Sequence, residues 1–197
     1  MGIQIYLVRH GKIAWKSEKA YIGQLDVPLS PEGVEQSEKL RAHFETIPLD
    51  QTYTSPLSRC VNTLDIILGD CPVPRLRIDA IKEIDMGEWD GKTFSEIKNS
   101  CPEIYEQRGR ELDIFAPPAG ESFIDLQQRV LPVFAEIIKD NHSKSILIVA
   151  HAGVIRVILA TLFGLSIKEV FNWTIPYAGI FNLCYNQEKD KWICKNQ

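Results

Sequence analysis

Five side chains that could bind and cleave an anionic ester lie next to predicted strands or helix starts. Arg9 and His10 follow the apolar run "IQIYLV", and His151 follows "SILIVA", just before an apolar helix. Arg59 lies in the first turn of another predicted helix, and Glu83 lies in the loop after "RLRID". Anions bind well at helix N-termini and beyond the carboxyl ends of parallel strands. Two arginines and two imidazoles there, with one carboxylic acid at the rim, would suit a phosphate group whose leaving oxygen faces the acid.

Short runs rich in β-branched and aromatic residues predict the strands that would carry these side chains. The clearest are "IQIYLV" and "SILIVA", which suit strands buried on both faces of a sheet. "QTYT" and "RLRID" predict two more strands, and "AGIFNLCYN" with "KWICK" predicts a hairpin at the end of the sheet. Because strands alternate with helices, we expect an α/β sandwich with a mostly parallel sheet.

The first helix is predicted over residues 30–44. Ser30 is a typical N-cap residue, and the proline that follows it suits the first helical position. Helical spacing then places Val34, Leu40 and Phe44 along one side. We therefore expect an amphipathic helix that packs these three side chains against the sheet.

Two later helices are predicted from similar signals. The pair Ser55 and Pro56 predicts a helix start, and Gly69 is expected to end that helix. From Ser122 onward, apolar residues at helical spacing predict a long helix, although Pro132 inside it should bend the helix or remove a hydrogen bond.

The composition is that of an ordinary soluble globular protein. Its 197 residues, 45% hydrophobic and 24% charged, predict a single domain over residues 1–197. The net charge of -4 and the pI near 5.6 argue against a nucleic-acid partner. No apolar run is long enough to span a membrane and the N-terminus lacks signal-peptide features, so we expect a cytoplasmic location. The five cysteines show no zinc-like spacing and are expected to be free thiols.

Four segments carry most of the residues with chemical potential, and they are "LVRHG", "SPLSRCVNT", "EIDMGEWDG" and "VAHAGVIR". Together, and in this order, they resemble the signature segments of the histidine phosphatase superfamily, which has the phosphoglycerate mutase-like fold. "PAGESF" also resembles the Gly-Glu-Ser segment that precedes the long helix of that family. The resemblance implies a three-layer α/β/α sandwich around a mostly parallel mixed sheet.

On the matching positions, the resemblance implies a role for each of the five side chains. His10 would be the nucleophile and Glu83 the proton donor. The phosphoryl group would be held by Arg9, Arg59 and His151. Neutral imidazole, whose ordinary pKa is ~6.5, attacks phosphorus at pH 7 without a metal, so no metal or cofactor is expected. The expected partner is a small-molecule phosphomonoester.

The run "RHGKIAWK" departs from the pattern of many family members. Lys12 and Ile13 replace an acid and a hydroxyl residue, and Lys16 occupies the place of an asparagine that often contacts the phosphate. Two roles are open for Lys16, either a charge that replaces the amide or a solvated side chain in a loop. Together with Gly23 it makes up the expected substrate rim. Gly11 would let the backbone approach the anion closely.

The leaving group is less well specified than the reaction. Residues 84–119 form a short interval with few basic residues, which favours a phosphatase over the longer phosphoglycerate mutases. The second half of the chain looks most like α-ribazole phosphatases, which act in cobalamin biosynthesis, and a broad sugar or nucleotide phosphatase is the alternative. A weakly catalytic member that binds phosphoesters or proteins is also open. The sequence does not indicate an oligomeric state.

Other residues have simpler expected roles. Trp89 is expected to pack in the core, and Glu121 to act as a cap or charge partner for the helix it precedes. Asp85 competes with Glu83 as proton donor, although the resemblance favours Glu83. His43 and His142 are expected at the surface.

Overall fold

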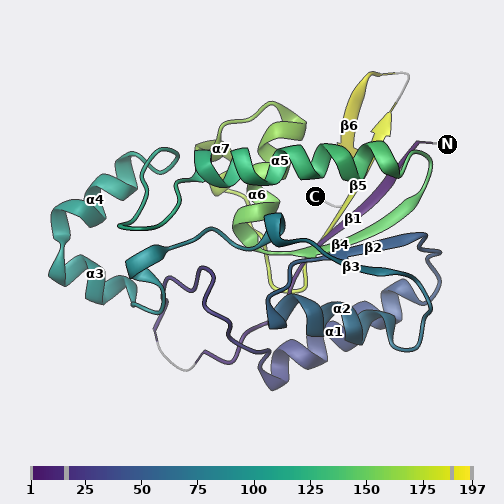
Figure 1. The fold of residues 1–197 in the computed structure, drawn as a ribbon, viewed down its shortest axis with the longest axis horizontal. Coiled ribbons are helices and arrows are strands. Elements are labelled where there is room, and N and C mark those ends of the chain that lie inside the picture. The colour runs from purple at the N-terminus through teal and green to yellow at the C-terminus, as the bar shows by residue number, and fades with distance from the viewer. Residues whose placement is uncertain (1, 16–17, 187–188, 196–197) are drawn as a thin grey trace.

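The structure is a computed structural model that describes residues 2–15, 18–186 and 189–195. Within these residues one sheet contains β1 (Gln4–Arg9), β2 (Gln51–Thr54), β3 (Arg75–Arg77), β4 (Ser145–Ala150), β5 (Ile180–Asn186) and β6 (Lys191–Cys194). The strand order is β3-β2-β4-β1-β5-β6 (Figure 1). Strands β3, β2, β4 and β1 run parallel to one another, β5 is antiparallel to β1, and β6 is antiparallel to β5. The predicted mixed sheet with a hairpin at its edge is therefore confirmed.

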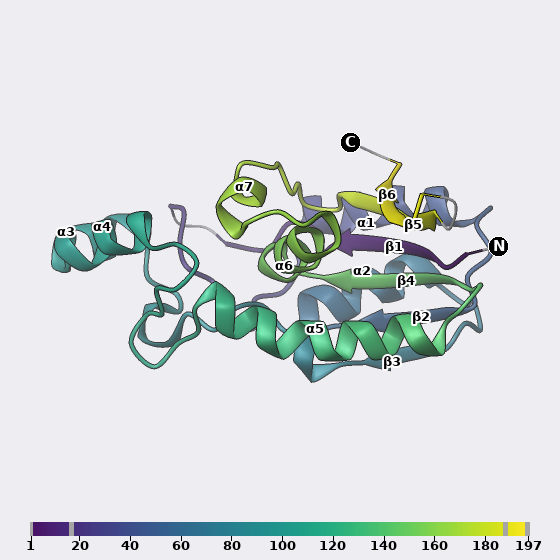
Figure 2. The ribbon, with the colours of Figure 1, turned by 90° about the horizontal axis from the view of Figure 1, so that it is seen from above.

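Helices cover both faces of the sheet and complete the three-layer α/β/α sandwich (Figures 1 and 2). They are α1 (Pro31–Phe44), α2 (Ser58–Leu68), α3 (Phe94–Ser100), α4 (Pro102–Arg110), α5 (Phe123–Asp140), α6 (Ala152–Phe163) and α7 (Ile167–Phe171). The central strands are buried on both faces, so their alternate side chains enter different cores. Leu7 packs with α5 and α6, and Val8 packs with α1 and α2.

The pairing of β1 with β4 brings two predicted site residues to the same edge of the sheet. Arg9 pairs with Ala150 in parallel register, so His10 and His151 are the residues that immediately follow the last pair. The backbone N–H of His10 donates to the carbonyl oxygen of Ala150 at 3.1 Å. Register alone therefore fixes these two histidines as neighbours.

Helix α1 begins as the sequence predicts and buries Leu40 and Phe44 as expected, but it differs from the prediction at one position. The Ser30 hydroxyl accepts a hydrogen bond from the N–H of Gly33 at 3.1 Å. Val34, expected to be buried, is 37% exposed, and Gly33 takes an inner position. A Cβ atom on Gly33 would lie 2.0 Å from the carbonyl oxygen of Lys12, and one on Gly11 would lie 2.4 Å from the carbonyl oxygen of Gly33. The close packing of α1 on the loop after β1 thus supplies a second reason for a glycine at residue 11.

Helix α2 begins at Ser58, so the predicted start at Ser55 is wrong. Its N-cap residue, Leu57, makes no side-chain cap. Instead Asp26, from a distant loop, accepts hydrogen bonds from the N–H (2.8 Å) and the hydroxyl (2.7 Å) of Ser58. Gly69 ends the helix with a φ of 51°, as predicted.

Helix α5 begins at the predicted N-cap. Ser122 and Asp125 form a capping box, and the helix then continues through Pro132. Its apolar side is buried against the sheet and α6. Among the described residues no helix combines the length and apolar character needed to cross a membrane.

Helices α3 and α4 lie beyond one end of the sheet, in a separate lobe (Figures 1 and 2). A small apolar cluster holds the lobe together and contains Tyr21, Met86, Trp89 and Ile97. Trp89 is only 4% exposed and packs within this cluster, which confirms its expected packing role. The lobe extends the end of the sheet at which β1 and β4 finish, and so can contribute side chains to a site there.

Candidate active site

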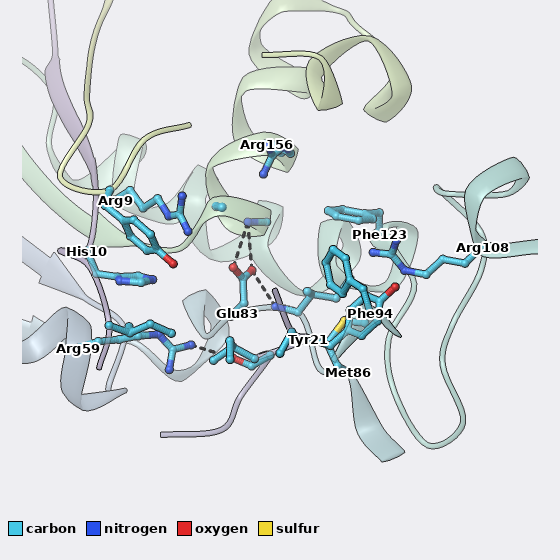
Figure 3. A pocket seen from close by; sticks show the side chains of 18 residues that line it. Arg9, His10, Tyr21, Arg59, Glu83, Met86, Phe94, Arg108, Phe123 and Arg156 are labelled. Atoms are coloured by element: carbon cyan, nitrogen blue, oxygen red, sulfur yellow. Dashed lines mark hydrogen bonds between the residues drawn. The ribbon is translucent and has the colours of Figure 1, made fainter. Parts of the chain in front are cut away.

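A pocket of about 220 Å³ lies at the carboxyl ends of β1 and β4. Figure 3 shows two groups of side chains along it, with Glu83 between them. At what we call the basic end lie Arg9, His10 and Arg59. At what we call the aromatic end lie Tyr21, Met86, Phe94, Phe123 and Arg108. Four of the five predicted site residues therefore line one pocket.

His10 is buried and held in one orientation. Its Nδ1 lies 2.8 Å from the carbonyl oxygen of Gly11, which can only accept, so Nδ1 carries the proton. The lone pair of the neutral ring is then on Nε2. Burial first, and then the charges of Arg59 and Arg9, lower the pKa of His10 well below its ordinary value. The imidazole is consequently uncharged at neutral pH, with a free lone pair on Nε2.

Arg9 presents its guanidinium beside His10. One terminal nitrogen donates to the carbonyl oxygen of Ile175 at 2.6 Å, and the guanidinium carbon lies 3.8 Å from the centre of the Tyr177 ring. Its Nε is buried and has no hydrogen-bond partner in the described residues. Arg9 is thus fixed by the protein but keeps donors for an anion.

Arg59, only 1% exposed, is held by two backbone carbonyls and by the ring of His151. Its terminal nitrogens donate to the carbonyl oxygens of Gly23 and Leu25, both at 2.7 Å. Gly23 also lines the pocket, and its positive φ of 47° favours glycine. A Cβ atom there would lie 2.1 Å from Oδ1 of Asp90. The backbone of the rim therefore orients Arg59.

His151 is fully buried and supports the basic end without lining the pocket itself. Its Nδ1 accepts from Nε of Arg59 at 3.3 Å, so Nε2 carries the proton and donates to the hydroxyl of Ser55 at 2.8 Å. Burial first, and then Arg59, lower the pKa of His151 well below its ordinary value. Ser55 is a residue whose role the sequence analysis missed, because its position before a proline resembles a helix cap.

Glu83 is held at the start of α6. Its carboxylate accepts hydrogen bonds from the backbone N–H of Ile84 (2.9 Å) and of Gly153 (3.1 and 3.2 Å). A Cβ atom on Gly153 would lie 2.3 Å from Oε1 of Glu83, so a larger residue at this position would displace the carboxylate. Asp85, the competing candidate, does not line the pocket and caps the N–H of Gly87 at 2.8 Å. The geometry therefore favours Glu83 as the acid that faces a ligand.

Arg129 fixes the loop that carries Glu83, and sequence reasoning missed it. Its five N–H groups donate to the carbonyl oxygens of Ala80, Lys82 and Glu83 and to both carboxylate oxygens of Glu121. Glu121 also accepts from the N–H of Asp85 at 3.0 Å. Glu121 is thus a charge partner of the helix it precedes, as expected, and it pairs with Arg129 of α5. The available sequence signal was the opposite charge of these two residues, which lie eight positions apart.

The remaining candidates differ in what the structure shows of them. Lys16, half of the expected rim, lies outside the described residues. Lys12 forms an exposed ion pair with Glu32, whereas Ile13 lines the pocket. His43 and His142 are exposed, as expected.

No group of three or more histidine, cysteine, aspartate or glutamate side chains in the described residues is placed to hold a metal ion. Cys60, Cys71, Cys101 and Cys184 are free thiols. Cys60 is buried beside His151, and burial raises the pKa of its thiol far above the ordinary range. It is therefore not a thiolate nucleophile.

Comparison with known proteins places this geometry in a family. The adenosylcobalamin/alpha-ribazole phosphatase of Escherichia coli is 25% identical over 88% of this chain and 85% of its own length. A 2,3-bisphosphoglycerate-dependent phosphoglycerate mutase of Bartonella quintana is 30% identical over 87% of each chain. The solved structure of Bacillus stearothermophilus YhfR superposes with a TM-score of 0.89 at 26% identity and covers 98% of this chain and 95% of that one.

The model of one family, described as the histidine phosphatase superfamily (branch 1), matches residues 5–197. The match includes the strand ends, the helix starts and the loop that form the pocket. The chain belongs to the histidine phosphatase superfamily.

Proposed function

We propose that the chain is a metal-independent phosphomonoester hydrolase that works through a phosphohistidine on His10. In the first step the lone pair on Nε2 attacks phosphorus, the ester P–O bond breaks, and its electron pair goes to the alcohol oxygen as Glu83 protonates it. In the second step Glu83 takes a proton from water, the water oxygen attacks phosphorus, and the electron pair of the P–N bond returns to Nε2. Phosphate then leaves.

The observation that carries this proposal is the fixed tautomer of His10. The hydrogen bond to the Gly11 carbonyl leaves Nε2 unprotonated, and burial with two nearby arginines keeps the ring neutral. Arg9 and Arg59 stand beside it to bind the equatorial oxygens. His151 supports them through its contact with Arg59, and the resemblance also implies direct contact with the phosphoryl group.

Magnitudes indicate which groups matter most. Enzymes accelerate the slowest phosphate-monoester hydrolyses by up to ~10²¹-fold, whereas a general acid such as Glu83 contributes ~10² to 10⁴. Most of the acceleration must therefore come from positioning phosphorus against His10 and from preorganised positive charge on its oxygens. The buried, hydrogen-bonded arginines of the basic end meet that requirement.

Hydrolysis and phosphoryl transfer between alcohols share the first step. The mutase relative is matched over 87% of its length, so overall length does not separate the two outcomes. We propose hydrolysis, because residues 84–119 form a small lobe with few basic residues. Equal amounts of inorganic phosphate and free alcohol would support it, and transfer to a second hydroxyl would contradict it.

For the alcohol, α-ribazole is the candidate supplied by the sequence resemblance, and the relative from Escherichia coli is named for that activity. The aromatic end of the pocket offers Tyr21, Phe94 and Phe123 to a flat ring. A broad range of sugar and nucleotide monophosphates is the alternative, and a flat activity profile across such a panel would favour it.

The mechanism is tested by trapping the intermediate. Protein mixed with 4-nitrophenyl phosphate and quenched in alkali should carry an acid-labile phosphate on His10, and turnover should persist in the presence of a chelator. Near-normal turnover by the His10→Gln variant would overturn the mechanism. Binding of phosphoesters without turnover would instead support the weakly catalytic alternative.

A further inference from the structure

Two arginines of the pocket, Arg156 and Arg108, are used neither by the protein nor by the proposed phosphoryl site. In the described part of the chain neither forms a hydrogen bond or lies within 4 Å of a carboxylate oxygen. Nε of Arg156 is buried without a partner. Their guanidinium groups make only ring contacts, 4.6 Å from the centre of Phe171 for Arg156 and 5.0 Å from that of Tyr21 for Arg108.

The charge balance of the pocket is unusual for a site that takes only one phosphate. Four guanidinium groups line it, and among the lining residues Glu83 alone has a carboxylate. A phosphomonoester dianion bound at Arg9 and Arg59, together with the Glu83 carboxylate, still leaves the pocket with a net positive charge. Arg156 and Arg108 are half-buried, and burial lowers the pKa of both, which reflects the cost of removing their charges from water. The charge of Glu83 raises the pKa of Arg156 but does not offset that cost, so a ligand anion would complete the pairing of these cations.

The position of Arg156 shows which part of a substrate it can reach. It follows Gly153 by three residues on α6, and Gly153 holds the Glu83 carboxylate. In Figure 3 its guanidinium stands over Glu83 on the side of the pocket away from Arg59. Glu83 must meet the leaving oxygen, so Arg156 lies beside the carbon atoms bound to that oxygen and not beside phosphorus.

We infer that Arg156 binds a second anionic group, a carboxylate or a further phosphate, on the leaving alcohol. Arg108 extends this positive region toward the aromatic end and suits a longer acidic group. The inference rests on the proposed hydrolysis at His10 and names its substrate class as phosphomonoesters of acidic alcohols. Residues 84–119 contain few basic residues, but one of them, Arg108, lines the pocket and contributes a positive charge there.

This class differs from the candidate supplied by resemblance. α-Ribazole is a neutral nucleoside, and bound there it would leave Arg156 unpaired. The pocket volume of about 220 Å³ also favours a small ester, because pockets for drug-sized ligands are typically ~300 to 1,000 Å³. Small phosphorylated acids carry the second negative charge that Arg156 would bind, and they fit a pocket of this volume.

The test uses pairs of esters that differ only at the second anion. 3-Phosphoglycerate is compared with glycerol 3-phosphate, and O-phosphoserine with O-phosphoethanolamine, by kcat/KM for phosphate release. We expect the acid of each pair to be preferred by about 10- to 100-fold, the range for a charge-assisted hydrogen bond. Ratios below about twofold, or a kcat/KM for α-ribazole 5′-phosphate above that of both acids, would overturn the inference.

Variants assign the preference to a residue. Arg156→Gln should collapse the acid-to-neutral ratio toward one, and Arg156→Lys should restore part of it. Arg110→Gln is the matched control, since Arg110 carries the same charge on α4 but is 67% exposed and 3.9 Å from Glu106. A preference that survives Arg156→Gln in a protein of unchanged melting temperature would contradict the assignment. The wild-type ratios decide the substrate class even if that variant does not fold.

The same panel separates this inference from the proposed function. If phosphate is released from every ester with no preference for the acids, the second-anion site is contradicted and the proposed hydrolase activity is supported. If phosphate moves within 3-phosphoglycerate to its other hydroxyl without release, hydrolysis is contradicted and the second-anion site is supported. If neither a phosphohistidine nor free phosphate forms from any ester, including α-ribazole 5′-phosphate, both proposals are contradicted.

Discussion

The two arginines of the basic end and the other two arginines of the pocket, Arg156 and Arg108, differ in how they are held. Arg59 is bound by two backbone carbonyls and an imidazole, and Arg9 by a carbonyl and a tyrosine ring. Arg156 and Arg108 have only ring contacts. The protein thus preorganises the groups that would bind the phosphoryl unit, which all its substrates share. Arg156 and Arg108 keep unpaired N–H donors beside the part of the pocket that would receive the alcohol, in which substrates differ.

We expect the largest loss of activity from a change at the basic end, at His10. Replacing His10 by glutamine keeps a neutral, polar side chain but removes the nucleophile, so kcat should fall by about 10⁴-fold or more. Steady-state release of phosphate from 4-nitrophenyl phosphate measures it. His43→Gln, on the exposed face of α1, is the control and should stay within about twofold of wild type. A His10→Gln protein within tenfold of wild type would show that another group attacks phosphorus.

The next effect lies at the boundary between the two ends. Glu83→Gln cannot donate a proton to the leaving oxygen or accept one from water, so kcat on alkyl phosphates should fall by ~10² to 10⁴. 4-Nitrophenolate leaves without a proton. The variant should therefore give a rapid burst of nitrophenolate while phosphate accumulates on His10.

Stopped-flow absorbance of nitrophenolate checks this burst. The exposed Glu88 provides a matched Glu→Gln control that should behave as wild type. Loss of the burst together with turnover would mean that Glu83 acts in binding and not in proton transfer.

A smaller effect concerns Arg129, which positions Glu83 and does not line the pocket. Arg129→Met frees the loop at residues 80–83, so alkyl phosphate turnover should fall about 10- to 100-fold, the cost of small misplacements in active sites. The burst with 4-nitrophenyl phosphate should persist. Arg75→Met, which removes an exposed arginine paired with Asp65, is the control. Equal losses on alkyl and nitrophenyl esters would indicate a general structural role.

The sequence predicted the basic end well because short-range rules apply there. The apolar runs that form β1 and β4 end at His10 and His151, and parallel pairing must then bring the two histidines together. Family resemblance supplied the roles. The error at Ser55 had a local cause, since a serine before a proline resembles a helix cap, whereas its hydroxyl binds His151 and Asp26 caps α2 from a distance.

The positions of Arg156 and Arg108 in the pocket could not be predicted in the same way. Arg156 lies on an apolar helix, and Arg108 on a short helix of the separate lobe, and neither has a pattern that indicates a ligand. Their convergence depends on the packing of the lobe through Tyr21 and Trp89, which is a long-range property. Arg129 was missed although Glu121 lies only eight residues away, because the three backbone carbonyls that reveal its role lie 46 to 49 residues away in the sequence.

The last prediction concerns how the free energy of unfolding depends on pH through the two buried histidines. The folded basic end keeps His10 and His151 neutral, with their pKa values well below 6.5, whereas the unfolded chain protonates both below about pH 6.5. The unfolded state then binds more protons, so stability falls as the pH falls, by about 1.4 kcal/mol per pH unit for each histidine.

Asp90 opposes this trend. Burial raises the pKa of Asp90 to about 6, so its protonation favours the folded state at lower pH. A comparison of wild type with His10→Gln removes the contribution of Asp90, because both proteins contain it. Urea unfolding at pH 6.0 and 5.0 should give a slope smaller by about 1.4 kcal/mol per pH unit in the variant. Identical slopes would mean that His10 is protonated in the folded protein at pH 5, and the fixed neutral nucleophile would then lose its physical basis.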